Sequence, residues 1–149
     1  MKLMHAAKIA LLAGFLLRPG NWDAEAEAWS RLLPHDWPGE HSGHLGERVA
    51  SGEAQAVDIL QDGVRVGVLV YDVDQSFSSP EMVILAAYSA APGSCDITAH
   101  CLPQIKQHAH EIGCATIRFH TMRPGLIAKC IKSGFRVSEV VMRTNVHVI

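Results

Sequence analysis

The spacing of hydrophobic residues along the chain predicts alternating strands and helices. Residues 13–18 are almost uniformly apolar and predict a strand that ends at Pro19. Apolar residues at helical spacing then predict a helix that extends to about residue 33, with Asn21 or Asp23 as its cap. After a turn-rich stretch, a second, short helix is predicted over residues 45–50.

The clearest β pattern is a hairpin in the middle of the chain. Two runs rich in β-branched residues, 54–60 and 64–73, flank the turn Gln61-Asp62-Gly63. Glycine accepts the positive φ that such a tight turn requires. Residues 82–88 are almost continuously apolar, which is typical of a central strand buried on both faces.

The second half of the chain predicts a parallel crossover. A helix capped by Ser94 or Asp96 is expected to extend to about residue 111, followed by a strand at 115–119. Pro124 suits the first turn of a further helix that ends at Gly134, and residues 135–148 alternate as one or more strands. A strand–helix–strand crossover between parallel strands is right-handed.

These elements predict an α/β fold over residues 1–149, as a single domain whose mixed sheet carries helices on both faces. The chain has 149 residues, 48% of them hydrophobic and 19% charged, which excludes a disordered polymer. Its formal net charge of -2 provides no basic field for nucleic acid or for an anionic membrane, so neither partner is expected.

The cysteines and the N-terminus bear on the cellular compartment. We favour buried thiols over two disulfides for the four cysteines, which are Cys95, Cys101, Cys114 and Cys130. Residues 1–17 resemble a secretory signal, but small residues are missing where cleavage would occur, and the run is too short to span a bilayer. We therefore expect a cytoplasmic protein whose first residues form a buried element.

Several segments resemble the Gcn5-related N-acetyltransferase (GNAT) superfamily. They are residues 15–23, the hairpin at 62–69, the central strand 82–90 with the turn and helix after it, and residues 123–135 with their Gly134-Phe135 end. The last segment is similar to short GNAT-like proteins carried by phages. The resemblance implies the GNAT fold and an acetyl-CoA donor between the fourth and fifth strands, with its pyrophosphate on backbone amides at a helix N-terminus.

The resemblance also implies which residues would hold acetyl-CoA. They are Ser89, Ala90, Gly93, Ser94, Cys95, Asp96, Ile97 and Arg123. This loop departs from the family pattern, because it keeps one glycine, Pro92 lacks a donor, and Asp96 places a negative charge near the phosphate position. Cys130 stands where the family usually has a tyrosine, and Arg123 where it has an asparagine.

Two residues of the central strand are candidates for catalysis. Glu81, at its start, is the candidate general base, and Tyr88, at its other end, could donate to an acyl carbonyl or a leaving thiolate. An exposed strand-end glutamate and a half-buried core tyrosine remain the structural alternatives. His120 and Thr121 follow the fifth strand, where ligands of open α/β sheets gather.

No metal site is predicted, because no histidine or cysteine spacing in the chain matches a zinc site. The leading hypothesis is an acetyl-CoA-dependent N-acyltransferase that acts on an amine of a small molecule or protein. The alternative is a non-catalytic GNAT-like binding or structural module, phage-encoded and located in the host cytoplasm or the virion. An unpaired edge of the final strand could also join two copies into a homodimer.

Overall fold

The computed structural model describes residues 14–32, 44–76, 78–90, 97–121, 123–144 and 146. Its strands form one mixed sheet in which each strand lies next to its neighbour in sequence. The first four strands are antiparallel to one another, whereas the last two are parallel. In sheet order they are β1 (Phe15–Gly20), β2 (Gln55–Gln61), β3 (Val64–Asp74), β4 (Glu81–Ser89) and β5 (Thr116–Phe119).

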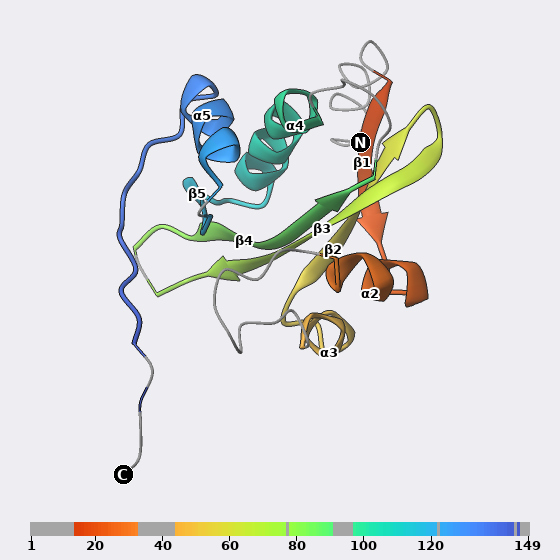
Figure 1. Cartoon of the computed structure of the whole chain (residues 1–149), viewed down its shortest axis with the longest axis horizontal. Helices are drawn as coiled ribbons and strands as arrows, with labels where there is room; N and C mark the ends of the chain where they lie inside the picture. Colours follow the sequence, from red (N-terminus) through yellow and green to blue (C-terminus); the bar gives the residue numbers. More distant parts are fainter. Residues whose placement is uncertain are drawn as a thin grey trace.

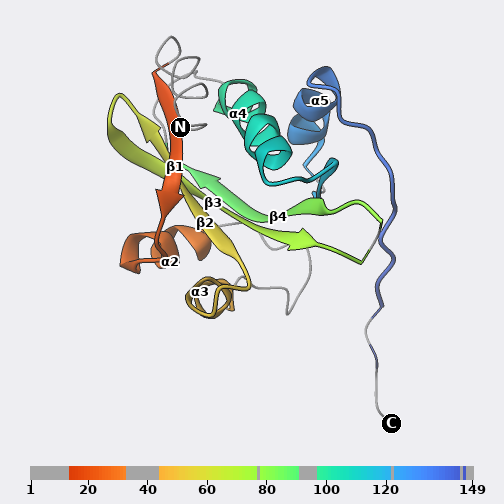
Figure 2. The ribbon, with the colours of Figure 1, turned by 180° about the vertical axis from the view of Figure 1, so that it is seen from behind.

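Helices cover both faces of the sheet, as the sequence predicts. α2 (Ala24–Ser30) and α3 (Leu45–Ala50) lie on one face, and α4 (Ile97–Glu111) and α5 (Pro124–Lys132) lie on the other (Figure 1). The view from behind shows the same two helical layers (Figure 2). Each layer encloses its own apolar core, one around Phe15 and Met82 beneath α4 and α5, the other around Ala26 and Val70 beneath α2 and α3.

Local sequence signals explain where several elements begin and turn. The Asp23 carboxylate accepts the Ala26 N–H at 2.9 Å and caps α2, as predicted. Asp62 and Gly63 both have positive φ, of 50° and 83°, and form the predicted tight turn between β2 and β3. The prediction that Pro19 ends the first strand is wrong. Pro19 lies inside β1 and pairs with Val57 of β2. A proline is tolerated here because β1 is an edge strand, so the position of the missing N–H need not face another strand.

Two predictions about strands are corrected by the structure. Within the described residues, the segment from Phe135 onward forms no strand, although its sequence alternates. A strand requires a neighbouring ladder, and this segment runs past the end of β5 and away from the domain (Figure 1). In β4 only Met82 is buried, and Ala87 and Ser89 are exposed, because among the described residues no strand lies beside the second half of β4 on its β5 side.

The close approach of β3 to the C-terminal end of β4 depends on Gly67 in β3. A Cβ added at Gly67 would overlap the Tyr88 carbonyl oxygen and come within 3.0 Å of the Ser89 Cα. We predict that Gly67→Ala lowers the free energy of unfolding by about 1–3 kcal/mol, since backbone atoms cannot move aside cheaply.

The matched control for that substitution is Gly125→Ala in α5. Apart from its chain neighbours and the backbone of α5 itself, no atom lies within 4 Å of a Cβ at Gly125, and alanine favours a helix, so this variant should be neutral or up to about 1 kcal/mol more stable. Urea unfolding of both variants measures the difference. Equal effects of the two substitutions would contradict the close approach of β3 and β4.

Candidate functional site

The candidate site begins where β4 and β5 part. β5 pairs with β4 over only four positions, from Glu81↔Thr116 to Ile84↔Phe119, whereas β4 continues to Ser89. The pairing of β4 with β3 shifts at the same place, since Val70 pairs with Ala86 and Tyr71 with Ile84, so that Leu85 is passed over. This β-bulge bends β4 at the point where β5 leaves it. Bulges of this kind are frequent beside active sites.

A hollow of about 1460 Å³ lies along β5 and the adjoining part of β4. Its walls come from β4, β5, α4 and α5, from the start of α3, and from the segment after Gly134. Among the described residues, five Lys or Arg line this hollow against two Glu, although the chain as a whole is slightly acidic. The lining therefore favours an anionic ligand.

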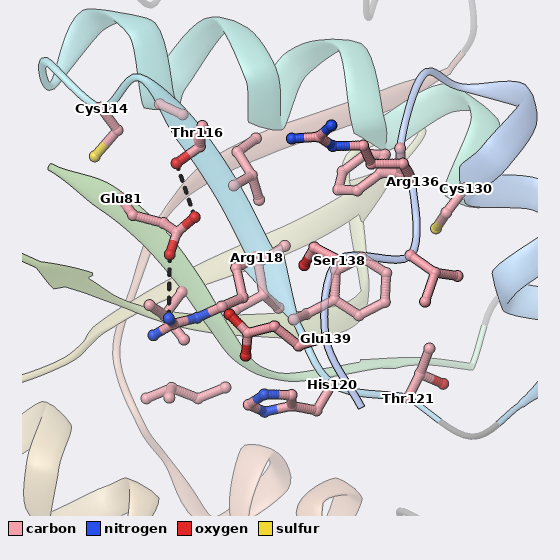
Figure 3. A pocket seen from close by; sticks show the side chains of 18 of the residues that line it. Glu81, Cys114, Thr116, Arg118, His120, Thr121, Cys130, Arg136, Ser138 and Glu139 are labelled. Atoms are coloured by element: carbon pink, nitrogen blue, oxygen red, sulfur yellow. Dashed lines mark hydrogen bonds and ion pairs between the residues drawn. The ribbon is translucent and has the colours of Figure 1, made fainter. Parts of the chain in front are cut away.

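An ion-pair network occupies the floor of the hollow (Figure 3). The Glu81 carboxylate accepts the Thr116 hydroxyl at 2.8 Å and pairs with Arg118 at 3.2 Å. Arg118 also pairs with Asp74 at 3.2 Å, and Asp74 lies directly opposite Glu81 across the β3–β4 ladder. Two like charges facing each other across strands repel, and Arg118 compensates both of them. Both oxygens of Glu81 are thus engaged.

The network has neighbours on α3 and in the loop after β3. The pKa of the Asp74 carboxyl is lowered mainly by hydrogen bonds from Ser76, first from the Ser76 side chain and then from the Ser76 backbone N–H. Arg118 lowers this pKa further. Arg48 of α3 binds Asp72 at 2.8 Å. These pairs tie the α3 layer and the β3–β4 loop to the β4–β5 boundary.

The structure separates the two catalytic candidates. Glu81 and Tyr88 stand at opposite ends of β4, about 23 Å apart at the usual rise of a strand. The Tyr88 ring stacks on Trp29 of α2, with centroids 5.5 Å apart, and contributes to the core on that face. Glu81 lines the hollow together with His120 and Thr121, the two residues that the sequence placed after the fifth strand.

The predicted acetyl-CoA contacts are described only in part. Gly93, Ser94, Cys95 and Asp96 lie outside the described residues. Ser89 ends β4 and is exposed, and the Ala90 N–H donates to the Val66 carbonyl at 2.7 Å. Ile97 is the first residue of α4. Arg123 precedes α5, is exposed, and its N–H donates to the Thr121 hydroxyl at 3.1 Å.

The described cysteines are free, buried thiols, namely Cys101, Cys114 and Cys130. Burial raises the pKa of Cys130, which stands where the family has a tyrosine, and raises the pKa of Cys101 to about 11. Cys130 nevertheless lines the hollow from the α5 side. A thiol with a raised pKa stays protonated at neutral pH and is a poor nucleophile.

Sequence reasoning missed the partners of Glu81. Thr116 and Arg118 alternate with Ile117 and Phe119 in β5, so the two polar residues face one side of the sheet and the two apolar residues face the core. The available signal in the sequence was the charged residue Arg118 inside a short strand, since such a charge needs a partner. The pairing with Glu81 could not be read from it, because the register of the two parallel strands is set by the crossover through α4.

Comparison with solved structures finds close matches in fold. The chain is similar to a GCN5-related N-acetyltransferase from Ralstonia eutropha JMP134, with a TM-score of 0.65 and 16% identity over 89% of this chain and 99% of that one. A possible acetyltransferase from Clostridium difficile 630 matches with a TM-score of 0.67 and 11% identity, over 90% and 98% of the two chains.

The chain has the GNAT fold. A further structure with this fold is the aminoglycoside N-acetyltransferase AAC(6')-Iy in complex with a CoA bisubstrate analogue, with a TM-score of 0.61 and 18% identity over 90% of this chain and 99% of that one. No protein-family description matches the sequence, and no curated protein matches it. In a GNAT fold, the parting of β4 from β5 is the feature that the sequence resemblance associates with acyl-CoA.

None of the helices among the described residues combines the length and the apolar character needed to cross a membrane. In the same part of the chain, no group of three or more His, Cys, Asp or Glu side chains is arranged to hold a metal ion.

The ion-pair network makes a prediction about stability. Arg118→Met leaves Asp74 and Glu81 facing each other without a cation, and we expect the free energy of unfolding at pH 7 to fall by about 1–3 kcal/mol. The deficit should shrink as the pH falls toward about 3, because the repulsion requires both carboxylates to be ionised. The Asp74 pKa is below its usual value in the folded wild type, so the wild type keeps the Asp74 contribution down to about pH 4 and loses it only as the pH falls further, through the folded-state pKa.

Urea unfolding at both pH values measures this effect. The control is Arg31→Met, which removes an exposed pair with Glu27 at 3.8 Å and should cost about 0.5 kcal/mol or less. A pH-independent deficit in Arg118→Met would assign its effect to lost packing and not to charge.

Proposed function

We propose that the protein is an N-acyltransferase that takes its acyl group from acyl-CoA. The observation that carries the proposal is the parting of β4 and β5 at the Leu85 bulge, beside a hollow whose charged lining residues are mostly Lys and Arg. A gap between β4 and β5 accepts an extended chain such as pantetheine without breaking the ladder between β4 and β3. Cationic side chains favour the phosphates of CoA.

The residues present fit acyl-CoA at the described end of the site. Leu85 and Ala86 line the hollow beyond the last β4–β5 pair, and His120 and Thr121 line it on the β5 side. The bound donor would supply an activated acyl group. The chain's own residues would hold it along β4, exclude water with α4 and α5, and accept the proton that the amine loses.

We place the proton acceptor at His120. Imidazole is the side chain most often used for proton transfer, and His120 is exposed where β5 ends, at the mouth of the gap. The oxygens of Glu81 are both engaged, by Thr116 and Arg118, so a catalytic role for Glu81 would require this network to open. The role of Glu81 as general base stays a prediction, which the variants His120→Ala and Glu81→Gln test below.

The acceptor is proposed as a primary amine on a small molecule or protein. Two proteins of similar fold are described as aminoglycoside acetyltransferases, so aminoglycosides are a rational start for a screen. A cytoplasmic location stays a prediction from the cysteines and the N-terminal residues, and a phage origin stays a prediction from the sequence resemblance.

A non-catalytic module is the second candidate. The engagement of Glu81 favours it, as does the loop sequence, in which Asp96 follows a single glycine. Such a protein would keep the fold and bind a ligand or partner without turnover. Acyl-CoA binding with no transfer to any amine in a broad screen would support this candidate over the enzyme.

Calorimetric titration with acetyl-CoA and with free CoA tests the donor site. We predict micromolar binding that weakens in Arg123→Ala and is lost in Ala87→Trp, because Ala87 is exposed on the half of β4 that β5 leaves uncovered. The control is Ala28→Trp, at an exposed alanine on α2, which should bind as the wild type does. An absence of heat at millimolar ligand would reject the transferase.

Steady-state kinetics with an accepted amine tests the proton acceptor. We predict that His120→Ala lowers kcat/KM by about 10²-fold, whereas Glu81→Gln mainly lowers thermal stability. The Glu81→Gln change keeps the side-chain shape and an oxygen for Thr116, so a structural role predicts little change in the pH–rate profile. A larger kinetic loss in Glu81→Gln than in His120→Ala would move the proton acceptor to Glu81.

A further inference from the structure

The hollow along β5 reaches both faces of the sheet, and these faces differ in chemistry. One face carries the polar side chains of Thr116 and Arg118, which Glu81 joins. Ile117 and Phe119 alternate with these polar residues along β5, so they face the layer of α4 and α5 instead. In Figure 3, Glu81 and Cys130 of α5 lie on opposite sides of β5. The hollow therefore has one polar side and one apolar side.

The apolar side, which we call the apolar arm, has a floor of strand residues and a wall of helix residues. The floor consists of Ile84, Ile117 and Phe119, and the wall consists of Ile127, Cys130 and Ile131. All three floor residues pack against the core beneath α4 and α5, yet each of them is only half-buried. This part of the core layer is therefore left open toward the hollow.

The wall of the arm is an apolar stripe on α5. Ile127, Cys130 and Ile131 are three and four residues apart, so they lie on one side of the helix. A stripe with this spacing normally packs against a core. Ile131 is nevertheless 53% exposed and Ile127 is half-buried, because both line the hollow. Apolar surface that meets water is stabilised when a hydrocarbon covers it.

The nearest cation on α4 leaves the surface of the arm apolar. Lys106 also lines the hollow, but its Nζ donates to the Ser133 carbonyl and lies 5.6 Å from the centre of the Phe135 ring. The ammonium group is thus held at the C-terminal end of α5. Among the six residues of the arm, the Cys130 thiol is the only polar side-chain group, and burial raises its pKa. A hydrocarbon suits this surface better than a phosphate or a sugar does.

The arm begins at the gap in the sheet. Ile84 and Phe119 form the last pair of the β4–β5 ladder, beyond which β4 continues to Ser89. The same two residues belong to the floor of the arm. The closed end of the gap that we propose for acyl-CoA is therefore the mouth of the arm.

We propose that the apolar arm holds the acyl group of the donor, and that the preferred donor carries an aliphatic chain longer than acetyl. The inference rests on the proposed function and narrows the class of its donor. Each methylene that moves from water into an apolar site strengthens binding by about fourfold. An acetyl group has a single methyl to place on this surface, whereas a longer chain can also cover the stripe on α5.

Calorimetric titration of the full chain with free CoA, acetyl-CoA and hexanoyl-CoA tests the arm without any turnover. We expect hexanoyl-CoA to bind at least about tenfold more tightly than acetyl-CoA, since two buried methylenes suffice for that difference. Succinyl-CoA, whose acyl chain ends in a carboxylate, should gain none of this advantage, because a charge is costly to bury in an apolar site.

The outcomes separate the inference from the proposed function. Equal binding of all four ligands, or tightest binding of acetyl-CoA, overturns the inference and leaves the donor site standing. Tighter binding of succinyl-CoA than of hexanoyl-CoA also overturns it, because cations of the lining such as Lys106 and Arg136 would then select the acyl group. An absence of binding by every CoA ligand rejects the proposed function and the inference with it.

Polar substitutions on α5 test where the chain lies. Ile127→Gln combined with Ile131→Gln replaces the stripe with side chains that also favour a helix. We expect the advantage of hexanoyl-CoA over free CoA to fall by about fivefold or more. The matched control is Ala128→Gln, at an exposed position of the same helix that does not line the hollow, and it should keep the advantage.

The quantity compared is the ratio of the two dissociation constants in each variant. Unfolded molecules bind neither ligand, so a partial loss of folding leaves this ratio unchanged. An unchanged ratio in the double variant would contradict the inference, and so would an equal loss in Ala128→Gln.

Discussion

β4 is paired with β3 along its whole length but with β5 along only its first half, and the arrangement of the site follows from this mismatch. The crossover through α4 must return the chain to a strand of four residues, so the sheet opens beyond Ile84. The bulge at Leu85 bends β4 at the same level. The helices above and below then enclose an opening that none of the described strands fills. The shape of the opening is therefore set by the backbone pairing of the strands. Substitution of a single side chain should change the lining of the opening and leave its shape unchanged.

The ion pairs sit at the closed end of this opening and hold its boundary. Arg118 joins β5 to β4 through Glu81 and to β3 through Asp74, so one guanidinium links three neighbouring strands. Such a link resists sliding of β5 along β4, which the few backbone bonds of a four-residue strand resist weakly. The Glu81 carboxylate, which the sequence predicts as the proton acceptor, thus holds the strands together. The exposed imidazole of His120 lies at the open end.

Much of the fold could be predicted from the sequence, because its signals were local. Asp23 as a cap, Asp62-Gly63 as a turn and Pro124 at the start of α5 each act within a few residues of themselves. The site was less predictable, because its contacts depend on register between strands far apart in sequence, as in the pairing of Glu81 with Arg118. The alternation after Gly134 predicted a strand, but a strand forms only beside a partner edge, and the alternation of one segment does not show whether the fold brings such an edge to it.

The two edges of the sheet differ in a way that bears on assembly size. Pro19 lies in β1, so the β1 edge lacks one of the N–H groups that an added strand would need. The β5 edge has no proline. Polymerisation of sheets edge to edge requires both edges of every molecule to accept a strand, so a weakened β1 edge disfavours it. The position of one proline therefore lowers the tendency of the protein to form fibres.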